Sequence, residues 1–505
     1  MLTPLSNALP GRSLKSRLSD MEGARLCLLG SIEASLKAYL SGHPEGHERA
    51  AIVMFRRHCS TTPGLSASDR FVAVSVHPFE ENWLTASSLT HFEFSLRHLR
   101  PLFQRCEEDG LVFGLAHSHP PGNPNFSYQD DENEQALLRA ITNRNGCDCH
   151  FVAMILCEGQ WHGRVRYGQT PHLATVVRHI ALLGDRLDLH AVPTSSAKTQ
   201  DDDDTWARQA AAFGRPFVDK LRSLRVAVVG CSGTGSPAAT LLARAGVGEL
   251  VLIDKDPLEK SNLNRVRGAR NADVGRNKAD IARDFIHGLG LDVRAVSIDA
   301  LVDVSSRAID TLASCDVIFG CTDDDLGRQA LNAAVSYYGL AYIDLGLGGC
   351  IDMGADGIPR MTHQHGRVSL VLPEFGECLY CQRVTNDKDA SRQQAIRDNP
   401  DITEEELRER YLDGGREPSP GVGPFTSAVA DLGVATLFDL IQPYRRLPGE
   451  LRRDLIFIDF VRLTTSSMAH TSEAGCPYCG TREHKLRATP YRLGRPQLGR
   501  HPRNV

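Results

Sequence analysis

The segment from His117 to Asp130 (HSHPPGNPNFSYQD) carries two histidines, a serine and an aspartate in an order that suits a hydrolytic zinc site. His117 and His119 follow the apolar run LVFGLA two residues apart, so on a strand both imidazoles point to one face. Asp130 would supply a third ligand. Three protein ligands leave one tetrahedral position open for water, whose pKa Zn²⁺ lowers from about 16 to about 7. The segment therefore predicts a catalytic metal site.

A structural interpretation of the same residues is also open. Ser127, followed by Asp130 and the run ENEQALLRAI, describes the capped start of a helix. The two interpretations can both hold.

A second candidate site begins with a glycine turn between a buried strand (LRVAVVG, 224–230) and a helix (PAATLLARAG), with a second strand (ELVLIDKD) after it. Gly230, Gly233 and Gly235 would let backbone amides approach phosphates at the helix N-terminus. Asp254, at the end of the second strand, stands where a carboxylate can bond ribose hydroxyls. The order GxxGxG, rather than GxGxxG, counts against a dinucleotide-dependent dehydrogenase.

Charged and polar residues follow in three further loops at the same expected sheet edge. They are Asp256 with SNLNR (261–265), then Lys278, then GCTDD (320–324). Ligands of an open parallel sheet bind at that edge. Each residue alone is ordinary on a protein surface, but the ordered set favours a nucleotide site.

Four cysteines form another candidate metal site. Cys378 and Cys381 make one CxxC, and Cys476 and Cys479 make a second. Each short loop can wrap a pair of thiolates around one side of a tetrahedral ion, and four thiolates would fill the coordination sphere of a structural zinc. A redox-active CxxC is the alternative interpretation.

The elements that position these motifs predict an α/β protein of two domains, because 505 residues exceed one ordinary core. The stretch PTSSAKTQDDDD predicts an acidic linker at 190–205. Before it, HLATVVRHIALLG looks helical. After it, basic residues rich in proline and glycine at 481–505 predict a disordered tail.

Composition excludes several other classes of protein. A net charge of −5 and a pI near 6.4 give no general basic surface, so we expect no nucleic-acid partner. No run of about 18 apolar residues and no signal-peptide core are present, so we expect no membrane association and a cytoplasmic location. Fourteen cysteines in a chain this long do not indicate a disulfide framework.

The segment around His117 resembles the signature of the JAMM metalloproteases, which release ubiquitin-like proteins. The resemblance implies that residues 25–175 form an α/β domain of the cytidine-deaminase-like type. It further implies that His117, His119 and Asp130 hold a catalytic zinc and that Ser127 helps to stabilise the oxyanion of the tetrahedral intermediate.

The JAMM family also requires an upstream glutamate as general base. Glu48, just before AAIVMF, is the candidate that the resemblance implies, and Glu45 is the alternative. The glycines that usually follow this glutamate are Ala51 and Phe55 here. If Glu48 points elsewhere, the site could bind zinc and still turn over slowly.

The glycine turn and its loops resemble the ThiF-type adenylyltransferases, the family of the ubiquitin-activating enzymes and of the activators of sulfur-carrier proteins. The resemblance implies that residues 206–480 form a Rossmann-like, doubly wound adenylation domain with a structural zinc. In that family the C-terminal carboxylate of a ubiquitin-like protein attacks the α-phosphate of ATP, giving an acyl adenylate and pyrophosphate. The protein contributes mainly position and charge.

The resemblance also implies roles for single residues. Arg265 and Lys278 match the cationic clamp on the triphosphate, Asp254 the ribose contact, Asn262 a second polar contact, and Asp323 the carboxylate associated with Mg²⁺. The three glycines and Asp256 complete the predicted ATP site.

Upstream, WARQAAAFG resembles the segment whose arginine reaches into the partner subunit's ATP site. The resemblance therefore implies a homodimer in which Arg208 acts across the interface. One departure is visible, because Val266 follows Arg265 where many members carry glutamine.

Members of the family that carry thioesters place a nucleophilic cysteine after the first CxxC, yet no cysteine occurs between Gln382 and Gly475. Cys350, in GLGGCID, is interpreted as small packing near a strand end, and Cys231 and Cys321 as loop residues beside the nucleotide. We therefore predict that the acyl group passes directly to an external thiol or amine, for example on a conjugating protein. The polar stretch 386–411 predicts a mobile helical crossover over the adenylate.

Two functions remain open at this stage. One is a bifunctional enzyme that cleaves after a ubiquitin-like protein and adenylates its C-terminus, resembling compact bacterial conjugation systems, some of which act in antiviral defence. The other is a scaffold that binds the ubiquitin-like partner while one or both domains turn over weakly or not at all.

Overall fold

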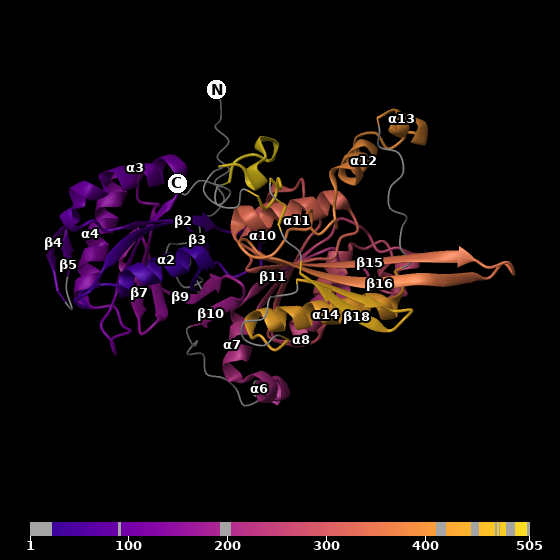
Figure 1. Ribbon diagram of the computed structural model, residues 1–505, viewed down its shortest axis with the longest axis horizontal. Coiled ribbons are helices and arrows are strands. Elements are labelled where there is room, and N and C mark those ends of the chain that lie inside the picture. Colours follow the sequence, from indigo (N-terminus) through magenta and orange to yellow (C-terminus); the bar gives the residue numbers. More distant parts are fainter. Residues whose placement is uncertain are drawn as a thin grey trace, which may run out of the picture.

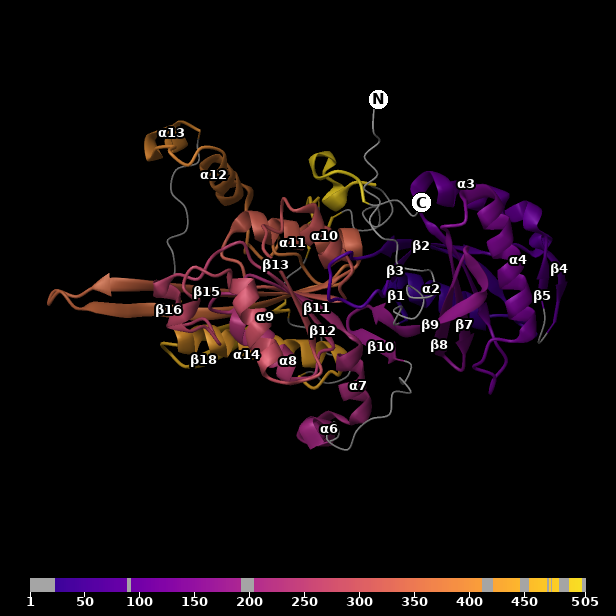
Figure 2. The same ribbon diagram turned by 180° about the vertical axis from the view of Figure 1, so that it is seen from behind.

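The computed structural model describes residues 23–88, 92–191, 204–410, 421–445, 454–469, 472–473, 475–480 and 490–501. They form two α/β units that lie side by side, each built on an eight-stranded sheet (Figures 1 and 2). The predicted linker at 190–205 falls mostly outside the described residues.

The first unit contains a sheet that curves back on itself, because β1 pairs with both β3 and β9. The strands in sheet order are β1 (Ala24–Leu29), β3 (Arg70–Pro78), β2 (Ala50–His58), β6 (Val112–Ser118), β7 (His150–Cys157), β8 (Gln160–Tyr167), β9 (Thr170–Leu183) and β10 (Leu187–Ala191). Its helices are α2 (Gly30–Ser41), α3 (Arg100–Asp109) and α4 (Tyr128–Asn145), and a small ribbon is made by β4 (Leu84–Ser87) and β5 (Phe92–Phe94).

The stretch HLATVVRHIALLG is a strand and not the helix that its apolar spacing suggested. It forms most of β9, which pairs with β8 over its first half and with β1 and β10 over its second. Its β-branched residues, among them Val176, Val177 and Ile180, favour a pleated strand once neighbours are available on both sides.

The second unit has the predicted doubly wound order. Its strands in sheet order are β13 (Arg294–Ile298), β12 (Glu249–Ile253), β11 (Arg225–Val229), β14 (Val317–Gly320), β15 (Ala341–Met353), β16 (Pro359–Val371), β17 (Leu455–Asp459) and β18 (Thr464–Met468). The first five run parallel and the last three add antiparallel pairings.

Helices cover both faces of this sheet, as the alternation of β11 requires. Val226 and Val228 pack with α8 (Gly235–Arg244), α9 (Lys278–Gly288) and α14 (Gly423–Ile441). Ala227 and Val229 pack with α10 (Ser306–Ala313) and α11 (Asp325–Tyr338). Among the described residues, α14 alone is long and apolar enough to cross a membrane by length and composition, and 56% of that window is buried inside the molecule, as in a core helix.

Strands β15 and β16 form a long hairpin, here called the arm, that extends beyond the rest of the sheet (Figure 1). Only residues up to Asp344 pair with β14, so the arm projects from the carboxyl edge of the parallel strands. Cys350 is exposed on the arm. Its interpretation as packing near a strand end is therefore wrong, because among the described residues no element covers that part of the hairpin face.

The two units are joined by buried charges at the opposite, amino edge of the second sheet. Arg25 donates to Asp316 at 2.9 Å, and Arg70 donates to the carbonyls of Tyr338 and Gly339 at 2.7 and 2.5 Å. Nearby, Arg225 donates to Glu249 at 2.6 Å and to the carbonyl of Ser66 at 2.9 Å. Apolar residues of both units also belong to one continuous core.

The C-terminal segment departs from the predicted disordered tail at 481–505, because residues 490–501 are packed against the second unit. Arg492 makes two hydrogen bonds to Asp310 on α10, at 2.8 and 2.7 Å. The backbone N–H of Leu493 donates to the hydroxyl of Tyr338, and His501 packs on His58 of the first unit. A buried leucine and paired charges thus anchor a segment whose composition is mostly polar.

Candidate functional site

His117, His119 and Asp130 converge on one point in the first unit. The Nε2 atoms of the two histidines lie 2.9 Å apart, and they lie 3.0 and 3.4 Å from the two carboxylate oxygens of Asp130. Ligands of a tetrahedral zinc with bonds of about 2.0–2.1 Å stand roughly 3.4 Å from one another. One donor atom from each residue therefore fits a single Zn²⁺ ion, and all three lie within 4.8 Å.

Local structure explains this convergence. The histidines lie at the end of β6, and Asp130 lies in the first turn of α4. Ser127 is the N-cap of α4: its Oγ accepts from the backbone N–H of Asp130 at 3.1 Å, while its own N–H donates to Asp130 Oδ2 at 2.6 Å. The capping interpretation is thus correct, and the same cap holds the Asp130 carboxylate toward the histidines.

The register of β2 against β6 favours Glu48 over Glu45. Ala50 pairs with His117, and the backbone N–H of Ser118 donates to the carbonyl of Arg49, which extends the alignment by one residue; the N–H of Arg49 donates to the Ser118 hydroxyl. Glu48 is therefore level with His119 and on the same face. Its side chain is largely buried, whereas Glu45 is exposed and pairs with His47.

The two positions where JAMM proteases usually carry glycine point away from this site. Ala51 and Phe55 belong to a core cluster on the face of β2 opposite Ala50. Phe55 covers Gly114, where an added Cβ would lie 2.6 Å from its ring. The larger side chains are therefore accommodated by the core and do not fill the metal site.

Two arginines that sequence reasoning missed support α4. Arg164 and Arg166 on β8 both donate to the buried Glu134, at 2.9 and 2.7 Å, and both also reach Asp131. The Arg164 guanidinium also stacks over Phe126, 3.9 Å from the ring centroid. The alternation RVR on a strand opposite two acidic residues one helical turn apart was the signal available in the sequence.

The glycine turn of the second unit has the close approaches that its sequence predicted. Gly230 has a φ of +89°, and a Cβ on Gly235 would lie 1.7 Å from the Gly230 carbonyl oxygen. No other residue type fits Gly235. The turn is also held by Asp254, whose carboxylate accepts from the backbone N–H of Cys231 at 2.7 Å and of Asp256 at 2.8 Å. Burial raises the pKa of Asp254, and these two backbone donors oppose the rise.

The predicted cations lie around this turn. Lys278 Nζ is 3.4 Å from Asp256 Oδ2, at the start of α9. Arg265 passes beside the glycines, since a Cβ on Gly233 would lie 3.2 Å from Arg265 Cδ. Asn262 is buried and accepts from the backbone of Glu259 at 3.3 Å, so in this structure it caps a short helix. Val266, the departure from the family pattern, is buried in a small apolar cluster.

Asp323 and Arg208 are less closely tied to the turn. Asp323 is exposed in the loop after β14, a strand adjacent to β11, so it shares the carboxyl edge with the glycines. Arg208 is exposed on α6 (Ala207–Phe213), next to Trp206, which packs against Gly246 at the far end of α8. The structure therefore does not bring Arg208 to the nucleotide loops of its own chain.

A buried cluster behind Asp323 also went unpredicted. Asp344 is fully buried and accepts from Arg367 at 2.5 Å and from the hydroxyl of Tyr342 at 2.6 Å. Arg328 lies 3.6 Å from the same carboxylate and donates to the carbonyl of Asp323 at 3.4 Å. Burial would raise the pKa of Asp344, but Arg367 and Arg328 lower it overall. These residues are far apart in sequence, so no local motif indicated them.

The segment expected to cross over the adenylate forms helices α12 (Asp387–Asp398) and α13 (Glu404–Glu409). Gln393 on α12 accepts from the backbone N–H groups of Asp325 and Leu326, at 2.7 and 3.2 Å. The crossover thus contacts the N-terminus of α11, two residues after Asp323.

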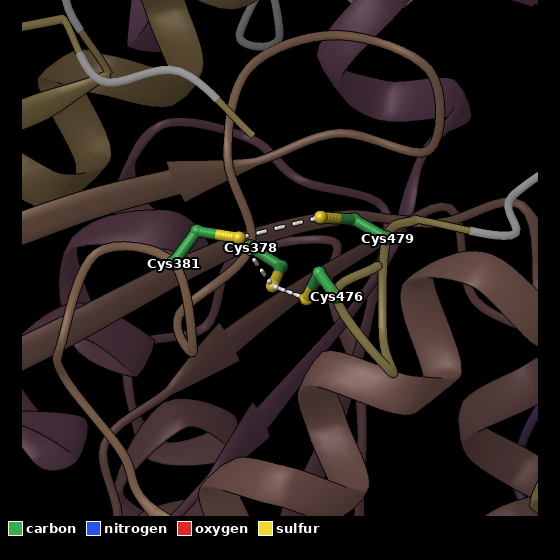
Figure 3. Close-up of side chains that lie close together, drawn as sticks. All are labelled: Cys378, Cys381, Cys476 and Cys479. Carbon is green, nitrogen blue, oxygen red and sulfur yellow. Dashed lines mark hydrogen bonds between the residues drawn. The ribbon is translucent and has the colours of Figure 1, made fainter. Parts of the chain in front are cut away.

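The four cysteines of the two CxxC motifs come together as the sequence predicted (Figure 3). Sulfur–sulfur distances are 3.8 Å for Cys378–Cys381, 3.6 Å for Cys378–Cys476 and 3.5 Å for Cys381–Cys479. Tetrahedral Zn–S bonds of about 2.3 Å place sulfurs roughly 3.8 Å apart. A hydrogen bond from Cys378 lowers the pKa of Cys479, which favours a thiolate there. The set fits a structural zinc and contains no open ligand position.

Comparison with known proteins finds relatives of the second unit. The model of the ThiF family matches residues 206–478. The Sulfur carrier protein ThiS adenylyltransferase of Escherichia coli is 36% identical over 263 residues, which is 52% of this chain and 88% of that protein. The SAMP-activating enzyme E1 of Haloferax volcanii is 40% identical over 124 residues, which is 25% of this chain and 46% of that protein.

Among solved structures, E. coli MccB with ATP superposes with a TM-score of 0.41 at 20% identity, over 57% of this chain and 75% of that chain. The family match is far more specific. The match covers more than half of the residues and includes the glycine turn, Arg265, Lys278 and three of the four CxxC cysteines, so the chain belongs to the ThiF family.

Proposed function

We propose that this chain adenylates the C-terminus of a ubiquitin-like or sulfur-carrier protein, and that its first unit cleaves after such proteins as a zinc isopeptidase. The adenylation half of the proposal depends on one observation: Arg265, Lys278 and Asp254 surround a turn in which Gly235 leaves no room for a side chain. The observation that carries the cleavage is the convergence of two histidines and an aspartate with Glu48 in register.

In the adenylation, each residue has a role that its position supports. The glycine turn and the N-terminus of α8 would hold phosphates, and Asp254 would accept from a ribose hydroxyl. Arg265 and Lys278 would neutralise the charge that builds up on the triphosphate as pyrophosphate leaves. Asp323 would hold Mg²⁺, which offsets the remaining phosphate charge. The chain thereby orients the tail carboxylate toward the α-phosphate.

ATP–pyrophosphate exchange tests this half of the proposal. Wild-type protein should exchange label only when a partner with a free C-terminal glycine is present, and Arg265→Ala should abolish the exchange. Arg383→Ala, an exposed arginine near the cysteine site, is the matched control and should retain it. Exchange that is independent of any partner, or unaffected by Arg265→Ala, would contradict the assignment.

In the cleavage, Glu48 would accept the proton of the attacking water, and Ser127 would face the oxyanion. A Zn²⁺ ion held by His117, His119 and Asp130 would supply Lewis acidity at the scissile carbonyl. The capping bonds from Ser127 and the arginine pair under α4 would keep Asp130 in place.

Cleavage of a fusion between a ubiquitin-like protein and a reporter tests this half. The reaction should require zinc and should stop in Asp130→Ala while the exchange reaction continues. Cleavage that persists after zinc is removed by a chelator and also in Asp130→Ala would contradict the proposed zinc isopeptidase.

The remaining parts of the proposal concern partners and setting. The acyl group would pass to an external thiol or amine on a conjugating protein, since the usual thioester cysteine is missing. The enzyme would act in the cytoplasm as a homodimer, within a bacterial conjugation system of the kind that includes antiviral defence.

A scaffold is the second candidate function. The absent thioester cysteine favours it, because a chain that no longer carries the activated protein can still bind it. No activity in either the exchange assay or the cleavage assay, together with retained binding of the partner, would favour this alternative.

A further inference from the structure

Gln364, on β16 of the arm, is a buried amide that no described residue satisfies. Its side chain is 1% exposed, and neither Oε1 nor Nε2 has a hydrogen-bond partner within the described ranges. Its backbone carbonyl is used, since it accepts from Phe460 at 2.8 Å. An unpaired buried amide costs stability, and a polar group bound at this position would offset that cost.

The pairing of the arm fixes the direction of this amide. Gln364 pairs with Gly349, and Gly366 pairs with Leu347 on the same face. A Cβ on Gly366 would meet Val429 of α14, so this face of the arm is the one that α14 covers. Gln364 therefore points to the α14 side of the sheet.

The amide lies level with the N-terminal turn of α14. It is two residues beyond Gly366, or about 7 Å further along the arm. Phe425 is four residues before Val429, or about 6 Å along the helix in the same direction. Phe460, which covers Gly366, stacks on Phe425 at 4.7 Å between ring centroids, and this contact ties the two positions together.

That turn of α14 also borders the nucleotide loops. A Cβ on Gly233 would lie 3.0 Å from the Thr426 side chain and 3.2 Å from Arg265. Thus α14 places Phe425 beside the arm and Thr426 beside the glycine turn. Gln364 therefore lies beside the same turn of α14 that borders the glycine turn on its other side.

Gly349 keeps the amide in this position. A Cβ there would lie 2.3 Å from Gln364 Oε1, so any larger residue would displace the side chain. The glycine and the glutamine form a matched pair across the two strands.

We propose that Gln364 is a subsite for the main chain of the incoming C-terminal tail. The amide offers an acceptor oxygen beside a donor NH2 group, which together match the N–H and C=O of one residue in an extended chain, because those two groups point to the same side. It would accept from the N–H of one extended tail residue and donate to the C=O of that residue, and so anchor the tail beside the nucleotide loops. The inference rests on the proposed adenylation and adds a substrate-positioning residue to it.

Gln364→Leu tests the proposal, because leucine keeps the volume and removes both polar atoms. With a synthetic peptide ending in Gly-Gly as the acyl substrate in ATP–pyrophosphate exchange, the variant should raise the KM for peptide by about tenfold. The KM for ATP and the kcat should not change. The melting temperature without peptide should rise by about 2–4 °C, because an unpaired buried amide has been removed. Gly349→Ala should raise the peptide KM in the same direction.

Gln382→Leu is the matched control. Gln382 is also buried, but its Nε2 donates to the carbonyl of Glu377 at 3.2 Å. Its loss should lower the melting temperature and leave the peptide KM unchanged. No exchange by wild-type protein would count against the adenylation itself. Exchange with an unaltered peptide KM in Gln364→Leu, or a melting temperature at or below wild type, would overturn the subsite.

Discussion

At the scale of single residues, the positions of some candidate site residues in the first unit follow from local sequence, whereas the position of Glu48 follows from strand pairing. His117 and His119 share a face because they are two apart on a strand, and Asp130 joins them because Ser127 caps the next helix. The position of Glu48 depends instead on the register of β2 against β6. Sequence alone therefore left Glu45 open, and the pairing favours Glu48.

Replacing these two glutamates should give opposite results. Glu48→Gln should lower the rate of zinc-dependent cleavage by about 100-fold or more, because a positioned general base is lost. Zinc content should stay the same, since Glu48 is not among the three predicted ligands. Glu45→Gln should cleave like wild type. Equal losses in both variants, measured on the same fusion substrate, would refute the assignment of Glu48.

At the scale of elements, the prediction succeeded where a motif lies within one element and its turn. The strand β11, the glycine turn and the helix α8 form one such unit, because glycine geometry and hydrophobic pattern agree. The prediction of a helix failed for β9. Its apolar spacing is compatible with a helix, but pairing with β1, β8 and β10 makes it a strand. The sequence prediction also missed the packing of residues 490–501 and the cluster around Asp344, because contacts distant in sequence create both.

The two groups of candidate metal ligands lie on separate elements and should bind zinc independently. Wild-type protein should hold two zinc ions per chain by elemental analysis, and both Asp130→Ala and Cys381→Ser should hold one. Only Cys381→Ser should also lower the melting temperature markedly, since four thiolates staple two loops that are nearly 100 residues apart in sequence. A single zinc in wild type, or a melting temperature unchanged in Cys381→Ser, would contradict this view.

At the scale of the whole molecule, buried charges fasten the two units to one another. Glu249 contributes through Arg225, and the backbone N–H of Ser66 from the first unit donates to it at 2.9 Å. Burial would raise the pKa of Glu249, but Arg225 and Arg25 outweigh burial and lower it to about 2. Asp316 shifts in the same direction, because Arg25 and His179 oppose its burial.

This lowered pKa predicts how stability depends on pH. A carboxyl that binds its proton less readily when folded stabilises the protein above its unfolded value of 4.5 and loses that contribution as pH falls toward 2. The free energy of unfolding of wild type should therefore exceed that of Glu249→Gln by about 2–3 kcal/mol at pH 6, and the gap should narrow by pH 3. Denaturant unfolding at both pH values measures it, and a gap independent of pH would contradict the charge pairing.

The placement of Arg208 leads to a prediction about assembly. Arg208 lies away from the glycine turn of its own chain, so the proposed homodimer would use it in the partner's site, and Arg208→Ala and Arg265→Ala should then each be inactive in adenylation. Mixing the two variants should restore up to about a quarter of wild-type exchange, because half of the dimers then contain one complete site. No recovery after mixing and subunit exchange would exclude the cross-subunit role.

The docking of the first unit on the amino edge has a kinetic consequence. The nucleotide loops open at the carboxyl edge, while the histidine pair lies on β6, three strands away from β1 and its contact with Asp316. If both proposed activities hold, a processed tail would have to dissociate from one site and rebind at the other. Turnover through both steps would then depend on diffusion and bulk concentration, and an unrelated molecule of the same partner could compete for the second step.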